Sequence, residues 1–205
     1  AQNDRASRLM ALKAGIQDVL SRPVDDLILL ARVRSLIRTQ GSREDIGLRA
    51  DASQAVGFAE AASGFETQPH VALIARDAAT AMRWQRQLAS TTRQRLTAHC
   101  LSDIPGLLSR PAPDGFIFEV SANGDGEEAR LISELRARGA TRDAAVLAVV
   151  EPPDTQRSAD LLDRGADDVL GTGFDAEELG LRLNAQITRK VRASRLRDQV
   201  RDGLR

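Results

Sequence analysis

A short pattern occurs twice in this chain of 205 residues, with the two copies 150 positions apart. The first copy begins at Leu12 and reads LKAGIQDVLSRPVD, and the second begins at Leu162 and reads LDRGADDVLGTGFD. Each copy predicts the end of a helix, a glycine stop, a short apolar strand, a polar turn and a new helix. A long run of alternating strand and helix signal precedes only the second copy. We therefore expect one complete α/β domain and the tail of another.

The composition excludes several classes of function. The formal net charge is zero, which gives no global electrostatic attraction to nucleic acid or to an anionic membrane. The single cysteine, Cys100, excludes an internal disulfide and suits a reducing compartment. No apolar run approaches the roughly 20 residues that cross a bilayer, and no basic-then-apolar leader begins the chain. These features predict a cytoplasmic protein with no nucleic-acid or membrane partner.

Residues 70–190 carry the regular alternation. Apolar runs predict strands at 71–75, 96–101, 115–120, 145–150 and 166–170. Helices are predicted at 78–90, 127–139, 155–164 and 175–191, with a short helix or turn at 104–109. Strands that alternate with helices predict a doubly wound parallel sheet covered on both faces, and a domain of this length fits the flavodoxin-like strand order 2-1-3-4-5.

The segments outside this domain give weaker signals. Before it, helices are predicted at 4–14 and 27–39 with a short strand at 16–20, and residues 41–69 predict a linker containing one helix. After it, residues 191–205 are basic. An apolar stripe continues from the last helix into them, which favours pairing with a copy of the same helix over a nucleic-acid patch. The stripe consists of Leu183, Ile187, Val191, Leu196, Val200 and Leu204.

Both copies of the repeat resemble the end of a bacterial receiver domain, where a Gly-Ala-Asp-Asp-apolar-Leu-Ser/Thr-Lys-Pro run spans the last strand. The first copy matches this run at Gly15, Asp18, Leu20, Ser21, Pro23 and Val24. The second matches it at Gly165, Ala166, Asp167, Asp168, Leu170 and Phe174. Residues 29–36 and 196–205 also look like parts of PleD-type response regulators, which are receiver–receiver–GGDEF diguanylate cyclases.

The resemblance implies a CheY-like fold and a division of the chain into four parts. Residues 1–40 would be the C-terminal part of a first receiver, and residues 41–69 the linker. Residues 70–190 would be a degenerate second receiver that acts as an adaptor. Residues 191–205 would be a connector helix toward an absent GGDEF domain.

The resemblance also implies that the second receiver has lost its phosphorylation chemistry. Receivers use an acidic pair for magnesium, an aspartate that accepts phosphate, a hydroxyl and a lysine. These positions fall, in that order, on Ala75 and Arg76, Glu119, Val150 and Thr172. We therefore expect residues 70–190 to bind neither magnesium nor phosphate.

Two positions keep more than one interpretation. Glu119 either imitates a phosphorylated aspartate, with Arg76 as its cationic partner, or is the solvated remnant of a lost site. Arg22 occupies the lysine position of the first copy and keeps the positive charge, and its bond to Pro23, if cis, would mark a receiver-type turn. The equivalent bond before Gly173 is expected to be trans.

The resemblance implies two-component signal transduction. The full protein would make cyclic di-GMP from GTP, while this fragment would be catalytically silent and hold no cofactor. Magnesium would belong only to an intact first receiver and to the cyclase domain. The implied partners are a second copy of the chain (with the N-terminal piece exchanged as a variant), the first-receiver core and GGDEF domain in cis, and a histidine kinase. The alternatives are a stand-alone pseudo-receiver adaptor and a flavodoxin-like nucleotide binder.

Overall fold

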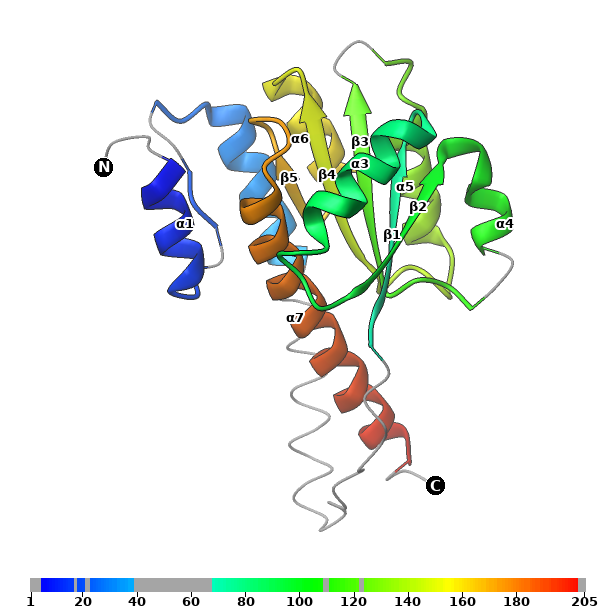
Figure 1. Ribbon diagram of the computed structural model, residues 1–205. Helices are drawn as coiled ribbons and strands as arrows, with labels where there is room; N and C mark the ends of the chain where they lie inside the picture. Colours follow the sequence, from blue (N-terminus) through cyan, green and yellow to red (C-terminus); the bar gives the residue numbers. More distant parts are fainter. Residues whose placement is uncertain are drawn as a thin grey trace.

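The computed structural model describes residues 5–16, 18–20, 23–38, 68–108, 111–121 and 124–202, with side chains as far as residue 191. We call residues 5–38 the N-terminal unit and residues 68–191 the sheet domain. Most of the predicted linker, and Arg22, lie outside the described residues. The N-terminal unit lies against one edge of the sheet domain, and the last helix runs out below the sheet (Figure 1).

The sheet domain contains five parallel strands in the order β2-β1-β3-β4-β5, which confirms the predicted topology. Its strands are β1 (His70–Ala75), β2 (Arg95–Cys100), β3 (Gly115–Ser121), β4 (Ala145–Glu151) and β5 (Asp168–Leu170). The central strands β1, β3 and β4 are almost wholly buried, as their continuous apolar runs require in a sheet covered on both faces.

Helices cover both faces because alternate strand residues point to opposite sides. Val71 and Leu73 pack with α3 (Ala78–Leu88) and α7 (Ala176–Asp202) on one face. Ala72 and Ile74 belong to the core of the other face. That second face is covered by α4 (Ile104–Leu108), α5 (Glu127–Ala137) and α6 (Thr155–Asp163), with a 3-10 turn, η1 (Leu101–Asp103), before α4.

Local sequence sets the helix boundaries in both parts of the chain. Asp77 and Asp154 cap α3 and α6 by accepting hydrogen bonds from backbone N–H groups of the first turn. Asp175 and Asp25 do the same for α7 and for the helix over residues 26–38. Gly165 follows α6 with φ +115°, a left-handed conformation that only glycine adopts easily.

The N-terminal unit confirms two of its three predicted elements. It contains α1 (Arg5–Lys13) and the helix over residues 26–38, joined by a segment that includes Asp18, Val19 and Leu20. The predicted strand at 16–20 is wrong over its described residues, which form no ladder. A strand needs a hydrogen-bonding neighbour, and the second copy has one because β5 pairs with β4. The first copy lacks such a neighbour among the described residues.

The last helix continues into the predicted connector. We predicted a helix at 175–191 and a connector helix at 191–205, and the structure has one continuous α7 from Ala176 to Asp202. None of the described helices is long and apolar enough to cross a membrane.

Candidate functional site

The predicted pocket residues lie at the carboxyl edge of the sheet, where parallel strands end together. Ala75 ends β1 and is completely buried, and Arg76 follows it. Glu119 lies in β3, and its Oε2 accepts a hydrogen bond of 2.9 Å from the backbone N–H of Arg76. The Arg76 guanidinium turns elsewhere and lies 3.9 Å from the Glu128 carboxylate. Glu119 and Arg76 are therefore in contact through the backbone of Arg76.

The other two predicted positions do not join this contact. Val150 is completely buried in the core that α5 and α6 cover, and it offers no hydroxyl. Thr172 is exposed in the turn after β5 and offers no positive charge. Within the described ranges, no group of three or more His, Cys, Asp or Glu side chains could hold a metal ion. The described pocket residues thus present one carboxylate and one guanidinium beside a buried apolar strand end.

The turn after β5 tests the predicted peptide geometry. The bond between Thr172 and Gly173 is trans, as expected, and Gly173 has φ +87°. The cis bond of the described chain joins Glu151 to Pro152 at the end of β4. The equivalent bond in the first copy involves Arg22, which lies outside the described residues, so that expectation stays a prediction.

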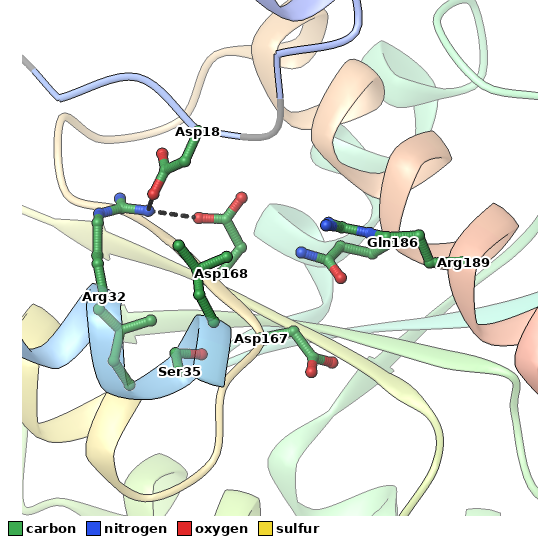
Figure 2. Close-up of a pocket in the computed structure, with 9 residues that line it drawn as sticks. Asp18, Arg32, Ser35, Asp167, Asp168, Gln186 and Arg189 are labelled. Carbon is green, nitrogen blue, oxygen red and sulfur yellow. Dashed lines mark hydrogen bonds and ion pairs between the residues drawn. The ribbon is translucent and has the colours of Figure 1, made fainter. Parts of the chain in front are cut away.

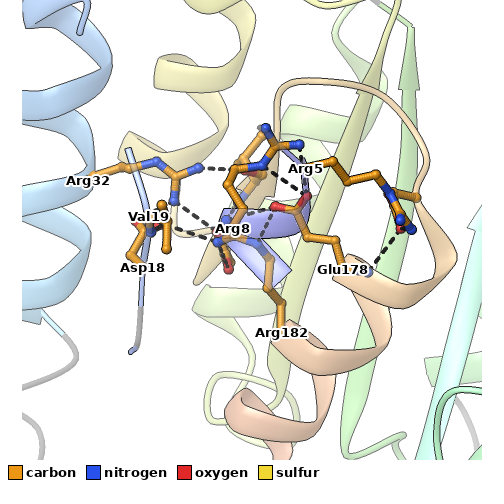
Figure 3. A network of polar contacts seen from close by, with 10 residues as sticks. Arg5, Arg8, Asp18, Val19, Arg32, Glu178 and Arg182 are labelled. Carbon is orange, nitrogen blue, oxygen red and sulfur yellow. Dashed lines mark hydrogen bonds and ion pairs between the residues drawn. The ribbon is translucent and has the colours of Figure 1, made fainter. Parts of the chain in front are cut away.

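A partly buried ionic cluster joins the N-terminal unit to the sheet domain. We call its four members, Asp18, Arg32, Asp168 and Arg182, the junction cluster. Figure 3 shows Asp18, Arg32 and Arg182 of this cluster. Arg32 contacts Asp18 at 2.5 Å and Asp168 at 3.0 Å. Arg182 contacts the same two carboxylates at 3.1 and 2.8 Å. Each arginine therefore bridges one aspartate from each part of the chain.

The members of the junction cluster are equivalent residues of the repeat. Asp18 and Asp168 are 150 positions apart, and so are Arg32 and Arg182. The two contact sets are reciprocal, since each arginine binds its own aspartate and the other copy's. Sequence reasoning missed the cluster although the spacing signal was available: the repeat was compared only as far as the turn, and Arg32 and Arg182 lie beyond it.

Burial and charge act against each other in this cluster. Burial alone raises the pKa of Asp168, but the guanidinium groups of Arg182 and Arg32 outweigh it and hold that pKa below the ordinary value. Burial lowers the pKa of Arg182, and the Asp168 and Asp18 carboxylates overcome this and raise it. The Arg182 side chain is only 3% exposed, so little water screens these contacts. Asp168 and Arg182 are consequently charged at neutral pH.

Further polar contacts extend the interface on both sides of the cluster. On one side, α1 lies against the start of α7, where Arg5 pairs with Asp175 and Lys13 lies 2.7 Å from Glu177. These hydrogen bonds lower the pKa values of Asp175 and Glu177. On the other side, the 26–38 helix lies against the end of α6, and Ser35 Oγ donates to the Ala166 carbonyl at 3.1 Å.

The interface leaves little internal space. A cavity of about 10 Å³ lies beside the cluster and is lined in part by Arg32, Asp168, Gln186 and Arg189 (Figure 2). That volume holds about one water molecule. Ala31 of the 26–38 helix is completely buried in the core of the sheet domain. The two parts are thus closely packed at the junction, and the cavity between them is too small for a metabolite.

The chain is similar to known response regulators in sequence and in fold. No family model matches the chain. Response regulator PleD of Caulobacter vibrioides, strain NA1000 / CB15N, is 29% identical over 201 residues, which cover 98% of this chain and 44% of PleD. PleD of strain ATCC 19089 gives the same values. The chain therefore spans less than half the length of the curated relatives it matches.

Solved structures match the sheet domain. The signal receiver domain of an HD domain-containing protein from Pseudomonas fluorescens Pf-5 aligns with TM-score 0.51 and 18% identity, over 62% of this chain and 99% of that one. A response regulator from Thermotoga maritima aligns with TM-score 0.50 and 19% identity, over 60% and 99%. At these identities the likeness shows the fold, which is that of CheY-like receivers.

Proposed function

We propose, on the premise that this chain is a PleD-like receiver protein, that its sheet domain signals by docking and takes up no phosphate. The observation that carries the proposal is the junction cluster. There, the face formed by α6, β5 and α7 binds a second unit built from equivalent residues. This cluster fixes the orientation of the two parts, because a shift would leave the buried charge of Asp168 or Arg182 without its partner from the N-terminal unit.

The N-terminal unit is, in this proposal, the tail of a first receiver. Its helix exposes Leu29, Val33 and Ile37. Their equivalents 150 positions later are Leu179, Leu183 and Ile187, which are buried against the sheet. The exposed residues therefore have the chemistry of a face that packs on a parallel sheet. We infer that a first-receiver sheet covers it in the longer protein.

The likeness to PleD suggests the setting of this docking. We propose a response regulator of two-component signalling whose cyclase domain makes cyclic di-GMP and lies in cis beyond α7. The sheet domain would then act as an adaptor in a homodimer, and a histidine kinase would phosphorylate only the first receiver. Magnesium would be needed there and in the cyclase domain.

Incubation with magnesium and beryllofluoride or acetyl phosphate tests the phosphate-independent part of the proposal. The support is Arg76 at a magnesium-ligand position and Val150 at the hydroxyl position. We expect an unchanged intact mass and unchanged amide NMR signals in residues 70–190. Phosphate on Glu119, or saturable magnesium binding in this domain, would refute the proposal.

Hydrogen exchange tests the docking part. Arg32→Ala removes two contacts of the junction cluster, so amides of residues 5–38 should exchange faster while β1, β3 and β4 stay protected. The matched control is Arg34→Ala on the same helix, whose side chain is exposed and pairs with Asp163 at 3.3 Å. Equal effects of the two substitutions would contradict a specific junction.

Light scattering tests the dimer. No described strand covers the exposed apolar residues of the 26–38 helix, so we expect this chain to self-associate at micromolar concentration. Association that survives Val33→Asp would support a homodimer formed away from that face, and a monomeric mass would count against a homodimer. A stand-alone adaptor remains the alternative, and a GGDEF sequence after α7 in the gene product would exclude it.

The nucleotide-binding alternative has less support. Ligands of open α/β sheets bind outside the carboxyl ends of the strands. A hollow of about 360 Å³ lies instead beside Arg93 and Gln94, at the start of β2. Thermal stabilisation by a flavin or a nucleotide would revive this alternative.

A further inference from the structure

A second group of charges lies at the carboxyl edge of the sheet, apart from the junction cluster. Glu128 belongs to the first turn of α5, and its side chain is only 2% exposed. Two arginines face it from different elements: Arg76 follows β1, and Arg157 lies in the first turn of α6. A buried carboxylate requires compensating charge or hydrogen bonds, so the contacts of Glu128 define what this group does.

The charge of Glu128 is compensated by two long ion pairs. Arg76 Nη2 lies 3.9 Å from Glu128 Oε1, and Arg157 Nη2 lies 4.0 Å from Glu128 Oε2. These distances exceed those of hydrogen bonds, and Oε2 has no hydrogen-bond partner among the described residues. The Nε of Arg157 also lacks one there. Two guanidinium groups therefore face one carboxylate with donors to spare.

Gly124 shows how closely the two guanidinium groups converge. A Cβ added to this residue would lie 3.2 Å from Arg76 Nη2 and 3.3 Å from Arg157 Nη2. Arg157 Nη2 also donates to the Gly124 carbonyl at 3.0 Å. Converging guanidinium groups beside the N-terminal turn of a helix are the chemistry that recognises phosphate and sulfate.

We propose that this is a two-arginine oxyanion site whose resident anion is the protein's own Glu128 carboxylate. Glu128 neutralises one of the two positive charges and occupies the space between the guanidinium groups. Free phosphate then meets a site that already holds an anion. The inference goes beyond docking at the junction, and it assigns the internal anion to Glu128, whereas the sequence suggested Glu119.

Inorganic phosphate, titrated at constant ionic strength against chloride, is the probe. Glu128→Gln removes the resident charge and keeps the shape of the side chain. We expect this variant to bind phosphate about tenfold more tightly than the wild type, because a negative charge about 4 Å away is lost. Saturable shifts of the Arg76 and Arg157 Nε–Hε NMR signals, and a rise in Tm, report the binding.

The adjacent Glu127→Gln is the matched control, since the Glu127 side chain is 44% exposed and pairs with Arg130 at 3.8 Å. It should leave phosphate binding unchanged. Adding Arg157→Gln to Glu128→Gln should abolish the gain. Equal phosphate affinity in Glu128→Gln and wild type, or a gain that survives Arg157→Gln, would overturn the proposal.

The wild type provides a readout that does not depend on the folding of any variant. Its arginine Nε–Hε signals should move only weakly, and without saturation, over the phosphate range that saturates Glu128→Gln. Saturation of both signals in the wild type within that range would show that Glu128 does not occupy the site, and would overturn the proposal.

Discussion

Val33 and Leu183 occupy the same place in two copies of one pattern, yet Val33 is 43% exposed and Leu183 is completely buried. Arg32 and Arg182, also equivalent, both lie in the junction cluster. Equivalent residues of the two copies thus have similar contacts in the junction cluster. They differ in burial on the helix face that packs on a sheet. Both partners of the junction are present in this chain. The sheet-facing residues of the N-terminal unit, by contrast, contact no described strand.

Among the substitutions that test this comparison, Arg182→Ala should lower the free energy of unfolding most. It leaves the buried Asp168 with a single cationic partner and also removes the contact to Glu178 at 3.0 Å. Breaking a buried ion pair from one side costs about 3–5 kcal/mol. Urea unfolding followed by circular dichroism measures the loss. Arg32→Ala should cost less, because the Arg32 side chain is 12% exposed against 3% for Arg182, so water screens the ion pairs of Arg32 more strongly; equal losses would show that the two arginines share the cluster evenly.

Leu183→Ala and Val33→Ala test the difference in burial between the two copies. Leu183 is completely buried against the sheet, and truncation of such a leucine costs about 2–5 kcal/mol in free energy of unfolding. Val33 is exposed, so its truncation should change that free energy by less than about 0.5 kcal/mol. Thermal unfolding of both variants provides the measurement. A large loss for Val33→Ala would mean that an undescribed segment or a second copy covers this face.

Acid should loosen the junction before it unfolds the sheet. The folded-state pKa of Asp168 lies below its ordinary value of 3.8, so its stabilising effect is complete above about pH 4 and is lost as the pH falls through the lower folded value. Asp175 shifts in the same direction and adds to the effect. Amide exchange of residues 5–38 between pH 6 and pH 3 measures it. Asp168→Asn should weaken this pH dependence, whereas the exposed Asp163→Asn should not.

The glycines that end equivalent helices should give the smallest contrast. Gly165 has φ +115°, and a Cβ there would lie 2.7 Å from Arg136 Cγ, whereas Gly15 has φ +88° and open space around it. Alanine in the left-handed region costs about 1–2 kcal/mol. Gly165→Ala should reach or exceed the upper value because Arg136 must also move, while Gly15→Ala should stay near the lower one. Differential scanning calorimetry detects both, and a reversed order would contradict the argument.

Periodicity was enough to predict most of the sheet domain. The apolar runs of β3 and β4 fixed both their positions and the parallel class, because strands buried on both faces have continuous apolar runs. The strand predicted at 16–20 failed for a physical reason: the same residue pattern forms β5 only where β4 is present to pair with it. A strand forms only when a neighbouring strand supplies its hydrogen bonds, so the sequence of one segment cannot predict it.

The candidate site was less predictable. Alignment with the receiver pattern located Arg76 and Glu119, but their contact runs through a backbone N–H that no pattern of side chains indicates. Glu128 carried no sequence signal, since its burial depends on α5 and α6 packing together. The junction cluster could have been found, because the 150-residue spacing of Asp18 and Asp168 also relates Arg32 to Arg182.

The uninterrupted α7 makes the junction cluster the base of a lever. Arg182 is held near the start of this helix, which continues to Asp202. At a rise of 1.5 Å per residue, the far end lies about 30 Å from the cluster. A tilt of about 10° at the base would therefore carry the far end sideways by about 5 Å, if the helix stays straight. A small rearrangement of the junction cluster would in this way become a displacement comparable to the pitch of the helix itself.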